Sequence, residues 1–265
     1  MRLKTSKHSM GPGKSSLLIA IDMGNTTTSY AIFKNRQILD FGSVKTVNIP
    51  KNCHFLNISG KYNAIHTVIC SVVPKKCHIL AKHISKNHQI KLYIVGKELK
   101  LNTPSAYNPK ALGLDRLVNV YGGLKFYRKP MLIIDFGTAI TFDYVSKRGR
   151  FEGGLIVPGV ETSAEALSAK AALIPKLKGI KHVRNLLGRD TDEAFQSGLL
   201  NGFGALADGL VERFKQRFGR NMTVVATGGF SKRISAYAKS FDYVDPLHTL
   251  KSLAQIYRNK IEDKP

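Results

Sequence analysis

The sequence predicts an α/β protein of two duplicated domains, and two observations support that prediction. First, the stretches at 17–38 and 131–151 each run an apolar, β-rich segment into an aspartate, then a glycine, hydroxyl residues and a second β-rich segment. Second, each half of the chain continues from strand-like segments into alternating helices and strands. At an offset of 113 residues, the repeat aligns Asp22 with Asp135, Gly24 with Gly137, and Thr28 with Thr141.

The chain divides into three parts. Residues 1–16 form a polar, basic leader that we expect to be disordered, residues 17–129 a first domain and residues 130–265 a second. A length of 265 residues is enough for two small domains, each with its own core. The boundary lies near Lys129-Pro130 because the second copy of the repeat begins directly after it.

Each domain is expected to open with three antiparallel strands, because turn-forming residues separate its β-rich segments. In the first domain these segments are 17–22, 29–34 and 37–44, and a strand, a helix and a strand follow at 66–73, 75–86 and 91–95. In the second domain they are 131–136, 140–145 and 150–157. Helices at 161–172 and 191–218, a strand at 222–227 and a helix at 252–261 complete it.

Composition limits the function classes. The formal net charge is +23, from 41 basic and 18 acidic residues, but the basic residues are spread along the chain without a dense block. Specific nucleic-acid binding is therefore not expected, and a general attraction of anionic ligands accounts for the charge equally well. The three cysteines show no CxxC spacing, which argues against disulfides and a zinc site. No apolar run reaches the roughly 18–20 residues of a membrane span, so we expect a cytoplasmic protein without membrane contact.

The repeated turn is typical of a phosphate site. A glycine two residues past the aspartate lets the backbone turn tightly and brings N–H groups near a bound phosphate. The hydroxyl groups add donors, and the aspartate can hold a cation that bridges phosphate oxygens. One such turn alone could be a hairpin with a surface aspartate. Two of them in matching strand context predict a clamp that holds a triphosphate across a cleft.

Six separated motifs resemble, in the same order, those of type III pantothenate kinases and the proteins called Bvg accessory factor. They are IDMGNT (21–26), NPKALGLDRLVN (108–119), IIDFGTAITFD (133–143), GGLIVPG (153–159), GRDTDEAFQSG (188–198) and ATGG (226–229). The resemblance extends from Leu17 to about Asn259. It implies two ribonuclease H-like domains, as in the superfamily of actin, heat-shock chaperones and sugar kinases, with a nucleotide cleft between them.

The resemblance also implies an activity: phosphorylation of pantothenate by ATP to 4′-phosphopantothenate, the first step of coenzyme A biosynthesis. It further implies Mg²⁺ with the ATP, a monovalent cation (K⁺ or NH₄⁺) held by Asp135, and a homodimer whose substrate pocket lies near the subunit interface. The positions that match ATP contacts are Asp22, Met23, Gly24, Asn25, Thr26, Thr27, Thr28, Ser29 and Thr138. The positions that match pantothenate contacts are Gly113, Leu114, Asp115, Arg116, Thr191 and, with a register shift, Tyr107.

The resemblance makes Asp115 the general base, and the local sequence suits that role. Asp115 begins a helix-like segment with apolar residues at helical spacing, namely Leu114, Leu117, Val118, Tyr121 and Leu124. The first turn of a helix favours an ionised carboxylate, and phosphoryl transfer needs a carboxylate to accept the hydroxyl proton. Without the family, the same residue could be a helix cap beside a surface Arg116.

Three hypotheses for function follow. The first is a pantothenate kinase, the second a kinase of the same fold for another small hydroxylated substrate, and the third a non-enzymatic transcriptional accessory protein. The GLDR, DMGNT and DFGTA motifs favour the two kinases, because a binding module need not keep both carboxylates. Two loops allow two interpretations each. GGLIVPG fits a β-turn or a backbone in contact with ligand, and Thr227-Gly228-Gly229 fits a strand-to-helix loop or an adenosine contact.

Overall fold

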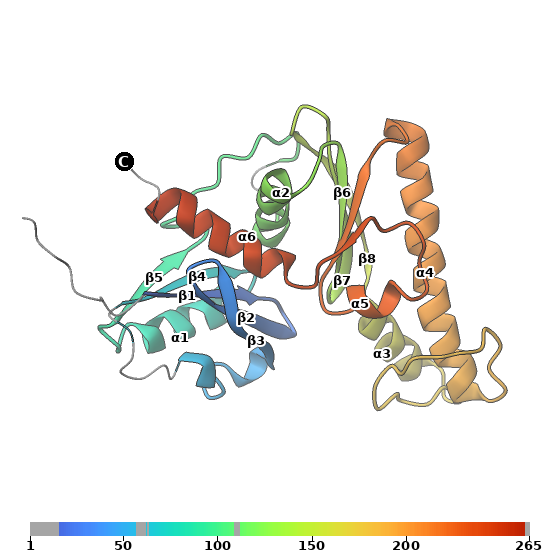
Figure 1. Ribbon diagram of the computed structural model, residues 1–265. Coiled ribbons are helices and arrows are strands. Elements are labelled where there is room, and N and C mark those ends of the chain that lie inside the picture. The colour runs from blue at the N-terminus through green and yellow to red at the C-terminus, as the bar shows by residue number, and fades with distance from the viewer. Residues whose placement is uncertain (1–15, 57–61, 63, 109–111, 263–265) are drawn as a thin grey trace, which may run out of the picture.

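The computed structural model describes residues 16–56, 62, 64–108 and 112–262 and contains two five-stranded sheets (Figure 1). The expected disordered leader lies outside these residues except for Ser16, and so does part of the NPKALGLDRLVN motif. Within the described part of the chain, no helix is long and apolar enough to cross a membrane.

The first sheet has the strand order β3-β2-β1-β4-β5. Its strands are β1 (Leu17–Met23), β2 (Thr27–Lys34), β3 (Gln37–Lys45), β4 (Ile65–Ser71) and β5 (Ile90–Ile94). Strands β1, β2 and β3 pair antiparallel, whereas β4 pairs parallel with both β1 and β5. The predicted meander and the two strands that follow it are therefore confirmed.

The second sheet repeats this topology in the order β10-β9-β6-β7-β8. Its strands are β6 (Met131–Phe136), β7 (Ala139–Val145), β8 (Phe151–Pro158), β9 (Thr223–Thr227) and β10 (Tyr243–Val244). Again the first three strands pair antiparallel, and β9 pairs parallel with β6 and β10. The sequence analysis did not predict β10, which has only two residues and no periodicity to detect.

The helices differ more between the two halves than the strands do. The described α-helices are α1 (Pro74–Ile84), α2 (Leu114–Phe126), α3 (Val160–Lys170), α4 (Thr191–Phe218), α5 (Ser231–Ile234) and α6 (His248–Tyr257). Two 3-10 turns (Thr46–Asn48 and His54–Leu56) lie between β3 and β4, where the second half has α3 and α4 between β8 and β9. A π-helical turn at Arg258–Glu262 follows α6.

Helices α2 and α6 lie side by side between the two sheets (Figure 1); α6 packs on the first sheet, whereas α2 contacts both sheets. Leu250 and Leu253 of α6 share a buried cluster with Leu18 of β1. Val120 of α2 shares another with Met131 of β6. The two helices approach closely at a buried glycine of α2, Gly122, where a Cβ would collide with Ser252 of α6. The sequence does not indicate that α6 covers the sheet of the other half.

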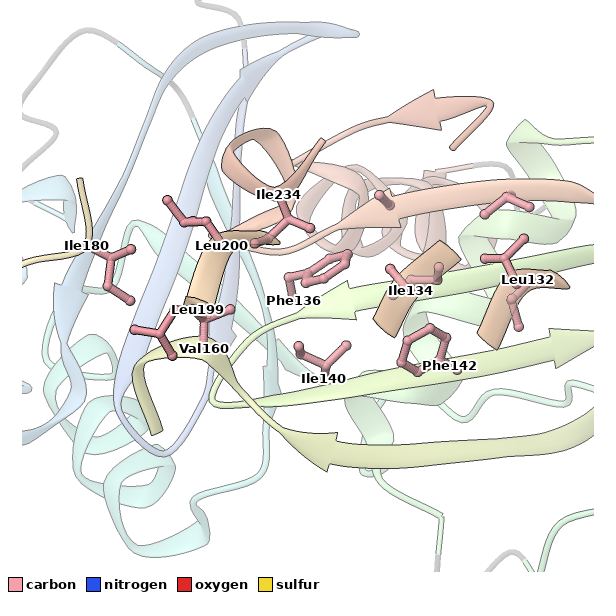
Figure 2. Close-up of a cluster of buried hydrophobic side chains, with 14 of the residues drawn as sticks. Leu132, Ile134, Phe136, Ile140, Phe142, Val160, Ile180, Leu199, Leu200 and Ile234 are labelled. Carbon is pink, nitrogen blue, oxygen red and sulfur yellow. The ribbon is translucent and has the colours of Figure 1, made fainter. Parts of the chain in front are cut away.

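The largest core fills the outer face of the second sheet, beneath α3, α4 and α5. Figure 2 shows side chains from β6 and β7 that meet residues of these helices, among them Leu132, Ile134, Phe136, Ile140, Phe142, Val160, Leu199, Leu200 and Ile234. Side chains alternate between the two faces of a strand. Because Leu132 and Ile134 face α4, Asp135 lies on the opposite face, on the side of α2. By the same alternation, Asp22 lies on the face of the first sheet that α6 covers.

The two turns that follow β1 and β6 differ in length by one residue. Asp22 pairs with Ser29 of β2, whereas Asp135 pairs with Thr141 of β7. The structural counterpart of Thr141 is therefore Ser29, and the alignment of Thr141 with Thr28 was wrong by one position. By the same register, the counterpart of Asp143 of β7 in the first half is Ala31 of β2.

Candidate functional site

The first acidic turn, residues 22–28, leads from β1 into β2 and is held from one side by Thr46. The Thr46 hydroxyl donates to the Gly24 carbonyl oxygen at 2.8 Å, and its amide donates to the Thr26 carbonyl at 2.9 Å. Thr28 is fully buried with its hydroxyl 2.9 Å from that of Thr46. Asn25, Thr26 and Thr27 are exposed. These contacts fix the turn while its tip stays accessible.

Two of the predicted ATP-contact residues face the core. The Met23 side chain belongs to the buried cluster under α1, and the Thr28 hydroxyl is used by Thr46. Their side chains are therefore structural parts of the turn. Asn25, Thr26 and Thr27 form the exposed part of the turn, and Gly24 and Ser29 are partly buried.

The second acidic turn, residues 135–140, touches the first. The Thr138 hydroxyl lies 3.2 Å from the Thr26 hydroxyl, so the tips of the two turns meet directly. The Thr138 carbonyl accepts hydrogen bonds from the Gly159 amide at 2.9 Å and the Thr162 hydroxyl at 2.7 Å. A Cβ at Gly159 would collide with the carbonyl oxygen of Gly137. The end of GGLIVPG therefore supports the turn by a close backbone approach.

Asp135 lies in a cradle of backbone and amide groups. Its Oδ2 accepts a hydrogen bond from Asn119 Nδ2 of α2 at 2.8 Å. Its Oδ1 lies beside Gly228, where φ is +87° and a Cβ would collide with that oxygen, so this position requires glycine. Burial raises the pKa of Asp135 to about 6; the Asn119 hydrogen bond opposes this, while the charges of Asp115 and Asp143 add to it.

The Asp135 cradle suits a monovalent cation. Among the residues that the structure describes, no three His, Cys, Asp or Glu side chains are placed to hold one metal ion. The donors near Asp135 are instead one carboxylate, nearby backbone carbonyls and the hydroxyl of Thr227, its register partner on β9. That hydroxyl is buried and has no partner within the described parts of the chain. Neutral oxygens with a single carboxylate are ligands that potassium accepts.

Asp115 lies in the first turn of α2, next to both acidic turns. Its Oδ1 accepts the Arg116 amide at 2.8 Å, so it satisfies one of the free N–H groups at the helix start. Its charge also acts on both strand-end acids. Burial, together with the charges of Asp135 and Asp115, raises the pKa of Asp22 to about 8. The structure therefore brings Asp22, Asp115 and Asp135 close enough for their charges to interact.

Arg116 does not lie on the surface. Its Nε and Nη2 donate to Asp143 Oδ1 at 2.9 and 2.6 Å, and both side chains are buried. The guanidinium lies over the rings of Tyr107, at 5.2 Å, and Phe151, at 5.5 Å. Burial raises the pKa of Asp143 to about 6, although the hydrogen bond and charge of Arg116 oppose this. Tyr107 and Arg116, both predicted to contact substrate, are thus neighbours.

Thr191 lies apart from the other predicted residues. It is the first residue of α4, and α4 packs on the face of the second sheet opposite to α2. It lines a cavity of about 740 Å³ with Leu167, Ile174, Arg189, Phe195 and Leu199. In the described parts of the chain, no hydrogen bond joins Thr191 to Asp115, Arg116 or either turn. Within a single chain, Thr191 therefore lies away from the other predicted site residues.

The sequence analysis missed two residues that contact the site, Asn119 and Asp143. Both had a detectable signal. Asn119 follows Arg116 by three positions and so shares its helix face. Asp143 interrupts an otherwise apolar strand, which indicates a buried acid that needs a partner.

Comparisons with known proteins agree with this geometry. A family model described as type III pantothenate kinase matches residues 18–213. A type III pantothenate kinase of Syntrophus aciditrophicus is 36% identical over 257 residues, covering 91% of this chain and 99% of that protein. One of Bacillus cytotoxicus is 32% identical over 262 residues, covering 92% and 97%.

Solved structures share the fold at low identity. A putative Baf family transcriptional activator from Campylobacter jejuni superposes with a TM-score of 0.56 at 18% identity, covering 91% of this chain and 98% of that one. A putative 2-dehydro-3-deoxygalactonokinase from Sinorhizobium meliloti gives 0.54 at 13% identity, covering 94% and 98%. With the duplicated sheet topology, these likenesses confirm the predicted fold of two ribonuclease H-like domains.

Proposed function

This chain belongs to the type III pantothenate kinase family and phosphorylates pantothenate with ATP in coenzyme A biosynthesis, and from that premise we propose how its residues divide the work. The observation that best supports these roles is that Asp115 lies close to both acidic turns, which contact each other. Phosphoryl transfer mainly requires that the reactants be positioned and that charge be neutralised, with one carboxylate to accept the hydroxyl proton. Two facing turns and a nearby base provide these elements.

The first turn receives the ATP phosphates in this proposal. The amide groups of its exposed tip and the Thr26 and Thr138 hydroxyls donate to phosphate oxygens from both sides of the cleft. Asp22 would hold the Mg²⁺ that accompanies ATP, and this ion supplies charge neutralisation at the phosphate oxygens when bound. The chemistry of Asp22 fits: no described side chain donates a hydrogen bond to its carboxylate, and burial and the negative charges of Asp135 and Asp115 raise its pKa, so a cation would be favoured beside it.

Asp115 acts as the general base. It takes the proton of the pantothenate 4′-hydroxyl as that oxygen attacks the γ-phosphorus of ATP, and the bond to the β–γ bridging oxygen breaks to release ADP. Gly113, Leu114, Arg116 and Tyr107 lie around Asp115 and contact pantothenate. Asp135 would hold the monovalent cation, which supplies a fixed positive charge between the two turns when bound.

We also propose that the enzyme is a homodimer, since Thr191 can join the site only from a second copy. The surface around Thr191 is apolar: α3 and the segment between α3 and α4 expose Leu167, Leu173, Leu186 and Leu187, and Leu173 is 91% exposed. Exposed apolar patches of this kind mark protein interfaces. We further expect the enzyme in the cytoplasm, with no specific nucleic-acid binding.

One assay tests the activity. ADP release should be measured with and without pantothenate, and the product should be identified by mass as phosphopantothenate. We expect pantothenate to stimulate ADP release strongly. A chain that releases ADP equally without pantothenate, or responds instead to another hydroxylated acid, would contradict the proposed substrate.

A further inference from the structure

The Asp135 carboxylate is held by a chain of buried groups that begins in α6. The Thr249 hydroxyl donates to Asn119 Oδ1 at 2.8 Å, and Asn119 Nδ2 donates to Asp135 Oδ2 at 2.8 Å. His248 Nε2 lies 2.9 Å from the Asn119 carbonyl oxygen. Asn119 is 1% exposed, so water does not replace these partners. The consecutive elements α2 and β6 thus meet α6, which is distant in sequence, at one amide.

The orientation of the Asn119 amide is fixed from both ends. An ionised carboxylate can only accept, so the amide NH₂ must face Asp135 and its oxygen must face α6. The Thr249 hydroxyl provides the donor that this oxygen requires. Without that hydroxyl, the buried amide oxygen would lack a partner, which costs free energy and weakens the preference for this orientation.

This hydrogen bond also determines which oxygen of Asp135 remains available. Asn119 occupies Oδ2, whereas Oδ1 lies next to the loop at Gly228 and faces the start of the second turn at Gly137. Gly228 and Gly137 both lie next to Oδ1, so backbone approaches this oxygen closely. Oδ1 is therefore the oxygen directed at the cradle.

We propose that Asn119 and Thr249 are positioning residues for the monovalent cation, so that cation affinity depends on a hydroxyl in α6. The inference rests on the proposed role of Asp135 as the cation ligand. It adds that α6, a helix packed on the first sheet, orients the carboxylate of Asp135 in the second sheet through Asn119. Groups that orient a metal ligand typically contribute 10–100-fold to metal affinity.

The test measures potassium binding without relying on turnover. Purified protein is heated in increasing KCl, with choline chloride keeping the ionic strength constant, and the shift in melting temperature gives the potassium dissociation constant. Thr249→Val keeps the shape of the side chain but removes the donor, and should raise this constant about tenfold. Asn119→Ala removes the whole link and should raise it up to about 100-fold. Pantothenate KM at saturating potassium should stay at the wild-type value in Thr249→Val.

Two control variants separate positioning from general damage. Thr249→Ser keeps the hydroxyl and should bind potassium as the wild type does. Ser252→Ala removes a buried hydroxyl from the same helix interface, one that donates to His248 O at 2.7 Å and does not touch Asn119. It should lower the melting temperature without changing the potassium constant. The positioning role would be overturned if Thr249→Val and Asn119→Ala bound potassium with the same affinity as Ser252→Ala.

The wild-type titration distinguishes the inference from its premise. If potassium stabilises the wild type no more than choline does, Asp135 holds no cation and both proposals fail. If potassium stabilises the wild type and both Thr249→Val and Asn119→Ala retain its affinity, only the positioning role fails.

Discussion

The two halves of the molecule share one sheet topology, but the acid at the end of the first strand of each half, Asp22 or Asp135, has different polar contacts with helices α2 and α6. In the second half, α2 gives a hydrogen bond to Asp135 and an ion pair to Asp143. In the first half, α6 gives no described hydrogen bond to Asp22, and the counterpart of Asp143 is Ala31. Burial raises the pKa of both acids, but the Asn119 hydrogen bond opposes this at Asp135, whose pKa is about 6 against about 8 for Asp22.

This difference shows how a duplicated site can become two unlike sites. The backbone of each turn fixes where the acid lies, and the neighbouring helix fixes what the acid can do. Asp135 has one oxygen committed to Asn119, which suits a permanent ligand of fixed geometry. The Asp22 carboxylate accepts no described side-chain hydrogen bond. This suits a residue that binds a metal ion only while the nucleotide is present.

The largest effect is expected at Asp115, the charge that acts on both turns. Asp115→Asn is nearly isosteric but cannot accept a proton at neutral pH. Turnover should fall by about 10²–10⁴-fold, the usual contribution of a general base. ATP binding, measured by calorimetry, and the circular dichroism spectrum should stay as in the wild type. Turnover equal to that of the wild type would remove Asp115 from the chemistry.

The ion pair that exists only in the second half should matter most for stability. Arg116→Gln leaves Asp143 buried without its cation, and breaking a buried pair in this way costs about 3–5 kcal/mol. Urea unfolding should show this loss. The double variant Arg116→Gln with Asp143→Asn should recover part of it, because no buried charge is then left unpaired. Equal stability of the single and double variants would mean that the pair contributes little.

Cation dependence should separate the two turns. Asp135→Ala should be poorly active in potassium, ammonium and sodium alike, with a loss of roughly 100-fold in potassium, the upper range for a disturbed metal site. The wild type should be far less active in sodium alone than in potassium. Asp22→Asn should lose activity but still gain thermal stability from potassium. Full wild-type activity in sodium would show that the second turn needs no specific cation.

How far the sequence predicts this molecule depends on which interactions decide each feature. Long periodic segments such as the helix at 191–218 were predicted with their observed bounds, because their apolar spacing fixes both type and extent. The meeting of Asp22 and Asp135 followed from the repeat. The packing of α6 on the first sheet could not be predicted, since an apolar helix face does not specify which sheet it covers. Asn119 and Thr249 were missed for the same reason: their contact depends on where α6 packs.

The smallest effect concerns the pH dependence of stability in protein free of ATP, Mg²⁺ and potassium. The pKa of Asp22 is about 8 in the folded protein against 3.8 for an ordinary aspartate. Between these values the folded state keeps a proton that the unfolded state has lost. Because the folded state then binds more protons, its stability falls as pH rises through this window. Asp135 has the same sign, but its pKa of about 6 ends the fall near pH 6.

Melting curves between pH 6 and pH 8 should therefore distinguish the two acids. Asp22→Asn has no proton to lose, so its melting temperature should fall less with pH than that of the wild type. At pH 8 we expect it to melt about 2–4 °C higher, the shift that ~1 kcal/mol produces in a protein of this size. Asp135→Asn should follow the wild-type slope over this range and depart from it only below pH 6. Parallel slopes for wild type and Asp22→Asn above pH 6 would mean that Asp22 is already ionised there, and that the two turns are electrostatically alike.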